Sequence, residues 1–419
     1  IEAVTGVQTC ALPIFYSRKH GDLEREYNFF QIDATNYSQG NSNFRDVNQN
    51  RRNDVYFFPF IEDTNIKTFF NLLQLDGFNP LVLKGSRFSI GSNIKASKLI
   101  EEYLNEKDSV SLVNFVKNPF TPGSILLFIE QSEMELKKDN IDLFFSRLIE
   151  LCEKDDLADF QEGYWVDHWT YNNDLLEQFT QVFPDKVIDL IFNNKEYTYY
   201  DNCAVVLPRV KRHILTNQGV RQYISVITIA KKEKMIKERN KKTNQVRSDF
   251  GMGDIYNSTL ISKIVCLIVN KIASLDSNGV GVEMEGNKPG WCDALNGLPA
   301  ILGSSINEST EIKRLSVMML DIFKTYKIND MSKVQVPVEL YIFFSKIKEI
   351  LSKEISDFTY WDLSNVYKEK YRESTTFGIS GKEESISIEE LTGFLELVVT
   401  KVEKRSEEHT SELQSPRLS

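Results

Sequence analysis

Apolar residues recur at spacings of three and four along most of the chain, which is the pattern of amphipathic helices with one buried face. The clearest helical segments are residues 66–75, 94–104, 141–152, 175–182, 259–275, 311–326 and 338–352. A further helix begins near Ser387, where Ser387 and Glu390 have the spacing of a capping box. Strand-like runs are few, and the best are 124–128 and 204–208. The pattern predicts a predominantly α protein.

Long connections rich in Gly, Asn, Asp and aromatic residues separate these helices, at residues 36–54, 160–173 and 282–305. Long loops inside a compact domain are uncommon unless they carry function. Aromatic faces, amides and charged groups are what a sugar site uses, because they cover the C–H surfaces and bind the hydroxyl groups. Helices joined by such loops indicate a helical toroid with a site at one mouth.

The two ends of the chain carry a separate signal. Residues 4–14 read VTGVQTCALPI and residues 405–415 read RSEEHTSELQS. Each string is the translation of a common sequencing adapter, and the two can be back-translated as reverse complements. We therefore expect residues 1–14 and 405–419 to be adapter-derived, to be set aside in fold reasoning, and to leave both natural termini missing. The alternative is a genuine leader and tail.

Charge and composition exclude some classes of partner. The net charge is −10, with 41% hydrophobic and 26% charged residues, as in ordinary soluble globular proteins. Without the adapter-derived ends, which carry four Glu and two Arg, the charge is −8. Nucleic-acid binders are typically basic, so none is expected as a partner. The one strongly basic run, residues 231–247, is predicted to be a solvated helix followed by a loop, with an anion or partner contact as the alternative.

The positions of the cysteines and lysines indicate the cellular compartment and whether a helix could span a membrane. Once Cys10 is set aside, the cysteines have no CxxC or metal-type spacing; they are Cys152, Cys203, Cys266 and Cys292. That pattern suits a reducing compartment, and a cytoplasmic protein is expected. The histidines are too far apart in sequence for a local zinc motif. Lys263 and Lys271 interrupt the most apolar helix, 260–273, which is therefore predicted to be buried and not to span a membrane.

The strongest chemical motif is the segment 288–299, KPGWCDALNGLP. Trp291 stands two residues before Asp293, which places a carboxyl group beside an indole. Burial against an aromatic ring raises the pKa of a carboxyl group, because desolvation disfavours its charged form. Such an acid can donate a proton to a departing glycosidic oxygen. The alternative is that Asp293 is a helix N-cap.

A second motif lies in residues 41–54, NSNFRDVNQNRRND. This short stretch contains the guanidinium group of Arg45, the carboxylate of Asp46 and the amide of Gln49. Together they could bind several hydroxyl groups of one sugar ring by hydrogen bonds. A surface salt-bridge cluster is the alternative.

These motifs carry a family resemblance. FRDVNQN resembles Phe-Arg-Asp-x-x-Gln-Asp, and GWCDALN resembles Asp-Trp-Asn-Asp-x-Leu-Asn, of the cellobiose phosphorylase type enzymes of glycoside hydrolase family 94. The related β-1,3-glucan phosphorylase families 149 and 161 share this layout, and the wording of the motifs favours family 161. The resemblance implies an (α/α)6 barrel, so residues 15–404 are expected to be a partial barrel catalytic domain. Complete relatives add β-rich domains.

By this resemblance, Asp293 is the general acid, Trp291 lines its pocket, and Arg45 and Asp46 hold the glucosyl unit. Three departures from the family motifs put substrate contacts in doubt while leaving the acid intact; they are Gly290, Cys292 and Asn50.

A third segment, residues 162–176, resembles the family's Glu-Gly-x-x-x-His-Trp sequence. It is expected to bring His168, Trp169 and Asp174 near the pocket. A packed aromatic loop is the alternative.

The resemblance implies an inverting phosphorylase, in which phosphate attacks opposite the leaving group and only one protein acid is needed. An inverting hydrolase needs a second carboxylate to activate water. Phosphate is bound by Arg, Lys, hydroxyl and backbone N–H groups. The candidates are Lys84, Arg87 and Arg372. The family's phosphate loops lie late in the chain, so this fragment is itself expected to be inactive.

The expected activity is phosphorolysis of a β-glucoside, with a β-1,3-gluco-oligosaccharide favoured, to α-glucose 1-phosphate. The partners are the β-glucan oligosaccharide and inorganic phosphate as co-substrate, with no other cofactor and no metal. A homodimer is compatible with the full-length protein. An inverting hydrolase on the same barrel and a non-catalytic carbohydrate-binding module are the alternatives.

Overall fold

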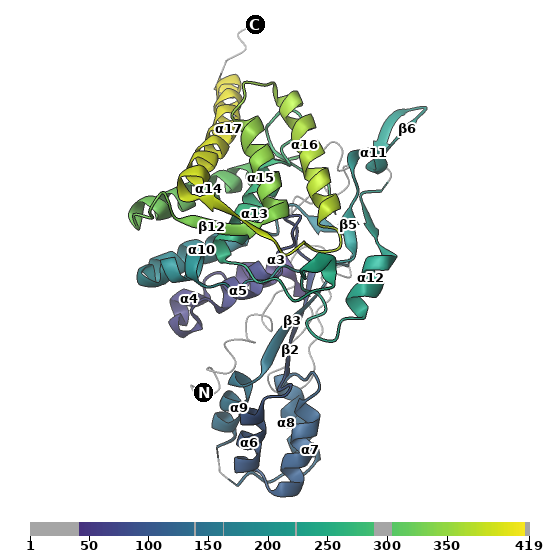
Figure 1. Cartoon of the computed structure of the whole chain (residues 1–419), viewed down its shortest axis with the longest axis vertical. Coiled ribbons are helices and arrows are strands. Elements are labelled where there is room, and N and C mark those ends of the chain that lie inside the picture. The colour runs from purple at the N-terminus through teal and green to yellow at the C-terminus, as the bar shows by residue number, and fades with distance from the viewer. Residues whose placement is uncertain (1–41, 138–139, 162, 223, 289–303, 415–419) are drawn as a thin grey trace. The chain divides into compact units, whose positions relative to one another are not determined.

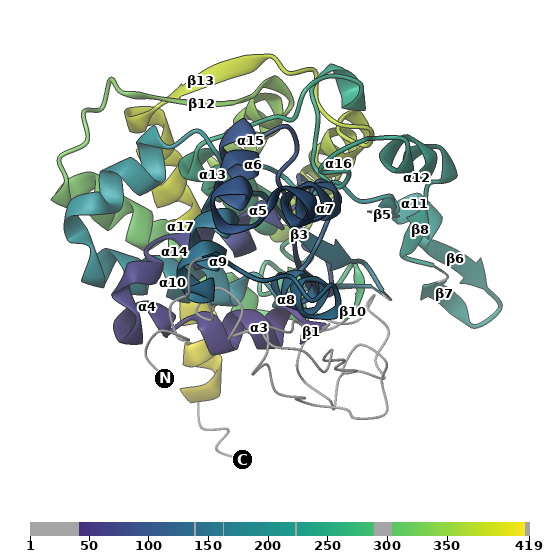
Figure 2. The same cartoon turned by 90° about the horizontal axis from the view of Figure 1, so that it is seen from below.

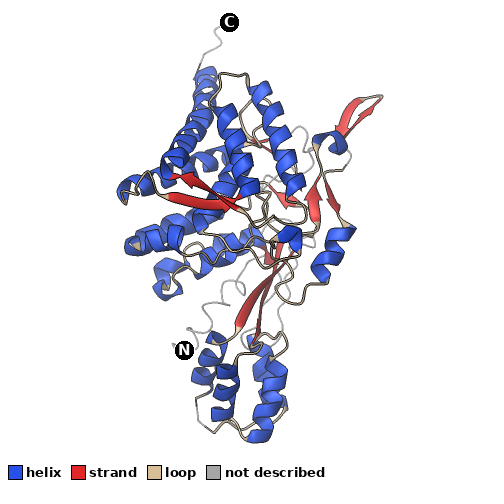
Figure 3. Ribbon diagram, in the orientation of Figure 1, coloured by secondary structure: helices blue, strands red, loops and turns tan. Residues whose placement is uncertain are grey.

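The computed structural model describes residues 42–137, 140–161, 163–222, 224–288 and 304–414 (Figure 1). The chain divides into two compact units. Unit 1 comprises Ile1–Thr64 and Pro80–Gln161, and unit 2 comprises Asn65–Asn79 and Glu162–Ser419. Helix accounts for 54% of the structure and strand for 16%, which confirms a predominantly helical protein (Figure 3). Closure into an (α/α)6 barrel stays a prediction.

Unit 1 contains a three-stranded antiparallel sheet in the order β1-β2-β3. Its strands are β1 (Ser42–Asn43), β2 (Val82–Ser89) and β3 (Glu153–Asp159). Opposite charges join β2 to β3: Lys84 Nζ lies 2.5 Å from Asp159 Oδ2, and Arg87 stands opposite Asp155 in the strand register. Polar and charged cross-strand pairs therefore stabilise the pairing of β2 with β3, two strands in which apolar and polar residues alternate little.

The helices of unit 1 follow the strands closely. They are α3 (Phe44–Arg51), α4 (Asp54–Phe57), a 3-10 turn (Pro59–Ile61), α6 (Ile94–Tyr103), α7 (Glu106–Val116), α8 (Pro122–Gln131) and α9 (Ile141–Glu150). Helices α6 to α9 enclose a hydrophobic core that includes Tyr103, Phe144 and Leu148. The Tyr103 and Phe144 rings are 5.0 Å apart. This core belongs to unit 1 alone.

Unit 2 is built around α13 (Leu260–Ile272), all thirteen residues of which are buried. Around it pack longer helices, and the helices of this unit are α5 (Thr64–Asn71), α10 (Thr170–Val182), α11 (Arg209–Arg212), α12 (Ala230–Lys237), α14 (Ile306–Thr325), α15 (Val338–Leu351), α16 (Asp357–Ser374) and α17 (Ile388–Gln414). Short 3-10 and π turns lie at Pro184–Lys186, Asp189–Asn193 and Asp249–Gly251. Helix α13 contacts both α14 and α15, so the most apolar helix forms the core.

The strands of unit 2 form two-stranded ribbons, which pair β4 with β10, β9 with β11, β5 with β8, β6 with β7 and β12 with β13. Their bounds are β4 (Tyr164–Trp165), β5 (Ala204–Val206), β6 (His213–Thr216), β7 (Gly219–Gln222), β8 (Val226–Thr228), β9 (Val282–Glu283), β10 (Asn287–Lys288), β11 (Ser304–Ser305), β12 (Lys333–Pro337) and β13 (Glu383–Ser387). Figure 2 shows β12 and β13 side by side, and the chain continues from β12 into α15 and from β13 into α17. Ribbon β4–β10 is parallel and joins the segment before α10 to the one after β9.

The predicted helices are confirmed. Helices α6, α9, α13 and α15 are close to their expected bounds, and α10 and α14 begin five residues earlier than expected. The strand predicted at 124–128 is wrong, because it lies inside α8. Thr121 caps that helix, with a capping box to Ser124 and Pro122 in the first turn. The periodicity of a short apolar run does not distinguish a strand from a helix. The helix-capping residues Thr121, Pro122 and Ser124 are the signal that indicates a helix here. The expected connection 36–54 contains α3, and residues 204–208 do begin with strand β5.

Candidate functional site

A buried lysine lies at the centre of the polar core of unit 2. Lys271 Nζ is 5.0 Å from the centre of the Phe78 ring and 5.5 Å from that of the Trp169 ring. Aromatic faces attract a cation, most strongly where water is excluded. Burial lowers the pKa of Lys271 to about 8, although Glu308 and Glu285 act in the opposite direction. Burial therefore weakens the charged form of Lys271, and the two carboxylates support it.

The segment before α10 supplies the aromatic side of this core. The Trp165 and His168 rings are nearly parallel, with centres 5.8 Å apart. His168 Nδ1 lies 3.3 Å from Nδ2, the side-chain amide nitrogen, of Asn79. His168 and Trp169 are each only 1% exposed. We name Phe78, Trp165, His168, Trp169 and Lys271 the aromatic–lysine cluster.

Glu308, in the first turn of α14, adds an acid to this core. Both of its carboxyl oxygens lie 3.3 Å from the hydroxyl oxygen of Thr170, and the residue is 2% exposed. Burial raises the pKa of Glu308 well above its ordinary value, and the charge of Asp167 raises it further. Glu308 is therefore a carboxyl group that folding biases toward its protonated form. Such a group can donate a hydrogen bond or a proton.

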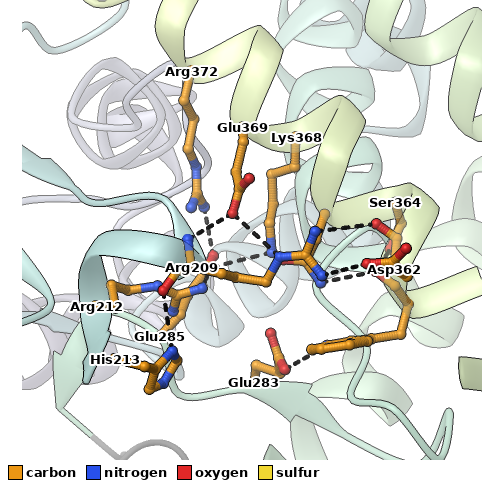
Figure 4. Close-up of polar contacts among 12 residues, drawn as sticks. Arg209, Arg212, His213, Glu283, Glu285, Asp362, Ser364, Lys368, Glu369 and Arg372 are labelled. Carbon is orange, nitrogen blue, oxygen red and sulfur yellow. Dashed lines mark hydrogen bonds and ion pairs between the residues drawn. The ribbon is translucent and has the colours of Figure 1, made fainter. Parts of the chain in front are cut away.

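Glu285 is the centre of a second group of charges (Figure 4). Its carboxylate oxygens lie 2.5 Å from Arg372 Nη2, 3.1 Å from Lys368 Nζ and 3.6 Å from Arg212 Nη2. Burial acts to raise the pKa of Glu285, but the three cations overcome it and hold that pKa well below its ordinary value. Burial also lowers the pKa of Lys368 to about 8. We name these four residues the Glu285 centre.

Further polar contacts surround the Glu285 centre. The indole N–H of Trp361 donates to Glu283 at 2.6 Å. Burial raises the pKa of Glu283, partly offset by Lys368. Arg209 lies beside them, with ion pairs to Glu369 at 3.3 Å and to Asp362 at 2.9 Å (Figure 4). The Arg209 guanidinium also lies over the Trp361 ring, 4.9 Å from its centre.

The predicted site residues of unit 1 lie on two elements. Arg45 and Asp46 begin α3, with Arg45 Nε 3.4 Å from Asp46 Oδ1, and both are almost fully buried. Their burial does not fit a surface salt-bridge cluster. Gln49, on the same helix, is half-buried. Lys84 and Arg87 are exposed on β2, where they face the acids of β3.

The predicted site residues of unit 2 are divided among three places. His168 and Trp169 lie in the aromatic–lysine cluster. Arg372 lies in the Glu285 centre, where it is bound to a carboxylate. Asp174, on α10, pairs with Arg314 of α14 at 2.8 Å. Their functional roles stay predictions.

The motif that contains Asp293 and Trp291 lies outside the described residues, and so do the departures Gly290 and Cys292. The general acid therefore stays a prediction from sequence.

Sequence reasoning missed Lys271, Glu285, Glu308 and Lys368 as members of a buried polar core. One signal was present: Lys271 interrupts an otherwise apolar helix, and a lysine that cannot reach solvent needs partners. Nothing in the spacing of Glu285 or Lys368 marks them as partners, since they are far apart in the chain and meet only in the fold.

In the part of the chain that the structure describes, no group of three His, Cys, Asp or Glu side chains could hold a metal ion. None of the helices described there is both long and apolar enough to cross a membrane. No protein-family model matches this chain, and no curated protein is significantly similar to it.

Proposed function

We propose that this chain is part of an inverting glycoside phosphorylase, an enzyme that cleaves a β-glucoside with phosphate and releases α-glucose 1-phosphate. The preferred substrate is a β-1,3-gluco-oligosaccharide. Asp293 donates a proton to the departing oxygen, and phosphate attacks the anomeric carbon from the opposite face. The proposal includes an (α/α)6 barrel and a cytoplasmic location.

One observation supports it among the described residues. The segment that resembles the phosphorylases, at His168 and Trp169, packs against a core in which several ionisable groups have strongly shifted pKa values: Lys271, Glu308, Glu285 and Lys368. Buried charges destabilise a fold unless they are fully paired. Shifted ionisable groups concentrate at functional sites, although structural ion pairs also produce them.

Burial defines what His168 and Trp169 contribute. Both side chains are 1% exposed, and their printed ring and cation contacts lie within unit 2. Under this proposal they are positioning residues that fix the loop between β4 and α10. The assignment of the glucosyl unit to Arg45 and Asp46 rests on the motif resemblance, because these side chains are nearly as buried, at 4% and 2% exposed.

The proposed reaction is tested by assaying laminari- and cello-oligosaccharides with and without phosphate, on this chain and on a longer chain that carries the family's late phosphate loops. We expect glucose 1-phosphate from the longer chain only, and only when phosphate is present. Asp293→Asn should lower the rate by about 10²- to 10⁴-fold, the usual contribution of a general acid. Asp185→Asn, at an exposed position, is the matched control and should leave the rate unchanged.

Two outcomes contradict the proposal. Glucose released equally well without phosphate would identify a hydrolase. Oligosaccharide binding by the longer chain without any turnover, unchanged by Asp293→Asn, would identify a carbohydrate-binding module.

A further inference from the structure

Unit 2 contains a pocket of about 490 Å³ beside the Glu285 centre. This volume lies within the range of small-molecule sites, about 300–1,000 Å³. Its polar wall includes Asp76, Asp201, Asn202, Lys232 and Arg372. Its apolar wall comes largely from ribbon β5–β8 and from α16, and includes Val205, Leu207, Ile227 and Val366.

Two donors in the wall have unused hydrogen-bonding capacity. Asn202 is 8% exposed; its side-chain oxygen accepts from the backbone N–H of Ala204 at 3.1 Å. The Asn202 Nδ2 group is buried and has no hydrogen-bond partner among the residues that the structure describes. The same holds there for Nε of Arg372, whose Nη2 binds Glu285. Buried donors are normally paired, so both groups call for an acceptor.

The buried acids at the wall already have cationic partners. Asp201 pairs with Lys232 Nζ at 2.7 Å and with Arg239 Nη1 at 2.8 Å. Glu285, which binds Arg372 Nη2, also pairs with Lys368 and Arg212. These pairs leave Asn202 Nδ2 and Arg372 Nε without an acceptor among the described residues.

The charged residues that line the pocket are equal in number, with four acids (Asp76, Asp201, Glu369 and Glu373) and four bases (Lys211, Lys232, Lys370 and Arg372). Asp76 accepts hydrogen bonds from Gln74 Nε2 and from the backbone N–H of Phe78. The ligand is therefore selected by the two unpaired donors and not by net charge. An oxyanion can accept from two donors, and hydrogen bonds that involve ionised groups are about twice as strong as neutral ones.

We propose that this pocket binds a small organic anion, either a carboxylate or a phosphate monoester. Its oxygens accept hydrogen bonds from Asn202 Nδ2 and Arg372 Nε, and its apolar part packs on the wall formed by Val205, Ile227 and Val366. The site goes beyond the proposed phosphorolysis, since its occupancy is measured as binding and not as turnover.

Calorimetric titration with four probes tests the chemistry of the site. Benzoate and phenyl phosphate present the two kinds of oxyanion on the same ring, benzyl alcohol is the neutral analogue, and inorganic phosphate is the anion without an apolar part. We expect at least one of the organic anions to bind about tenfold or more tightly than benzyl alcohol, the usual advantage of hydrogen bonds to a charged group. Inorganic phosphate should bind more weakly than that anion.

Asn202→Asp tests the location. The substitution keeps the shape and the oxygen that binds Ala204, but replaces the donor with a negative charge. Affinity for the organic anion should fall about tenfold or more. Asn278→Asp makes the same change of charge at an exposed turn and should leave the affinity unchanged.

A second variant keeps the test decisive if Asn202→Asp does not fold. Lys370 is exposed at the rim, so Lys370→Glu should fold normally and weaken anion binding about two- to fivefold at low salt, with little effect at high salt. Equal binding of benzyl alcohol, or no effect of either variant, would overturn the site. The proposal would also be overturned if inorganic phosphate bound as tightly as phenyl phosphate. That result would instead support the phosphate-binding role that the sequence predicted for Arg372.

Discussion

Glu308 shows how a single carboxyl group responds to folding. It is 2% exposed, its neighbour Asp167 is an acid, and the positive charge of Lys271 only partly compensates. In the unfolded chain the same group titrates at its ordinary pKa. Folding therefore favours the protonated form, because the charged form would lose its hydration without gaining a full ion pair.

This shift makes stability depend on pH. Because the folded pKa is raised, the contribution of Glu308 is fully present below the unfolded pKa and is lost as pH rises toward the folded pKa. Glu308→Gln mimics the protonated form. The variant should match the wild type near pH 4 and become the more stable protein as pH approaches neutrality, in urea unfolding followed across that range. Glu354→Gln makes the same change on the surface and should leave the pH dependence as it is; an identical pH profile for Glu308→Gln would contradict the assignment.

At the scale of elements, one arginine joins two helices. Arg314 of α14 reaches three carboxylates, at 2.8 Å from Asp174, 2.5 Å from Glu177 and 3.1 Å from Glu311. Asp174 and Glu177 both lie on α10. Helices α10 and α14 are therefore joined by a partly exposed network rather than by a buried pair.

The network predicts an asymmetry between its members. Asp174→Asn removes one of three acids and should lower the free energy of unfolding by less than about 1 kcal/mol, as for a partly exposed ion pair. Arg314→Gln should destabilise more, because three acids then repel one another. Chemical denaturation of both variants measures the difference. A larger loss for Asp174→Asn than for Arg314→Gln would show that Asp174 has another role, as the family resemblance suggests.

At the scale of the whole molecule, the chain forms two compact units, each with its own core. All four tryptophans of the sequence fall within the residue range of unit 2. Indole fluorescence should therefore report the unfolding of unit 2, while the far-ultraviolet circular dichroism reports the helices of both units. Separate cores favour separate unfolding transitions.

Matched core variants test this expectation. Phe144→Ala, in the core of unit 1, should remove about 3–5 kcal/mol and shift only part of the dichroism transition. Phe344→Ala, equally buried in unit 2 and 4.8 Å from the Phe394 ring, should shift the fluorescence transition. If Phe144→Ala moves both signals together, the two units unfold as one.

Local patterns account for the elements that the sequence predicted well. Helix periodicity depends on residues three and four apart, so α9, α13, α14 and α15 could be located without knowledge of their neighbours. The start of α17 is similarly local, and the backbone N–H of Glu390 donates to the Ser387 hydroxyl at 3.1 Å, as the capping motif predicts. Strands β2 and β3 could not be found this way. A bulge between Leu83 and Gly85 breaks the alternation of β2, and four of the seven residues of β3 are acidic.

By itself the sequence determined the helical class, the buried character of α13 and a resemblance carried by short motifs, because each of these depends on residues close together in the chain. Only the tertiary structure decided that Lys271 approaches the rings of Phe78 and Trp169. The same is true of the three cations that meet at Glu285 (Figure 4). Those contacts join residues up to about two hundred positions apart. Charge and desolvation act through space, so the chemistry of this core exists only once the chain has folded.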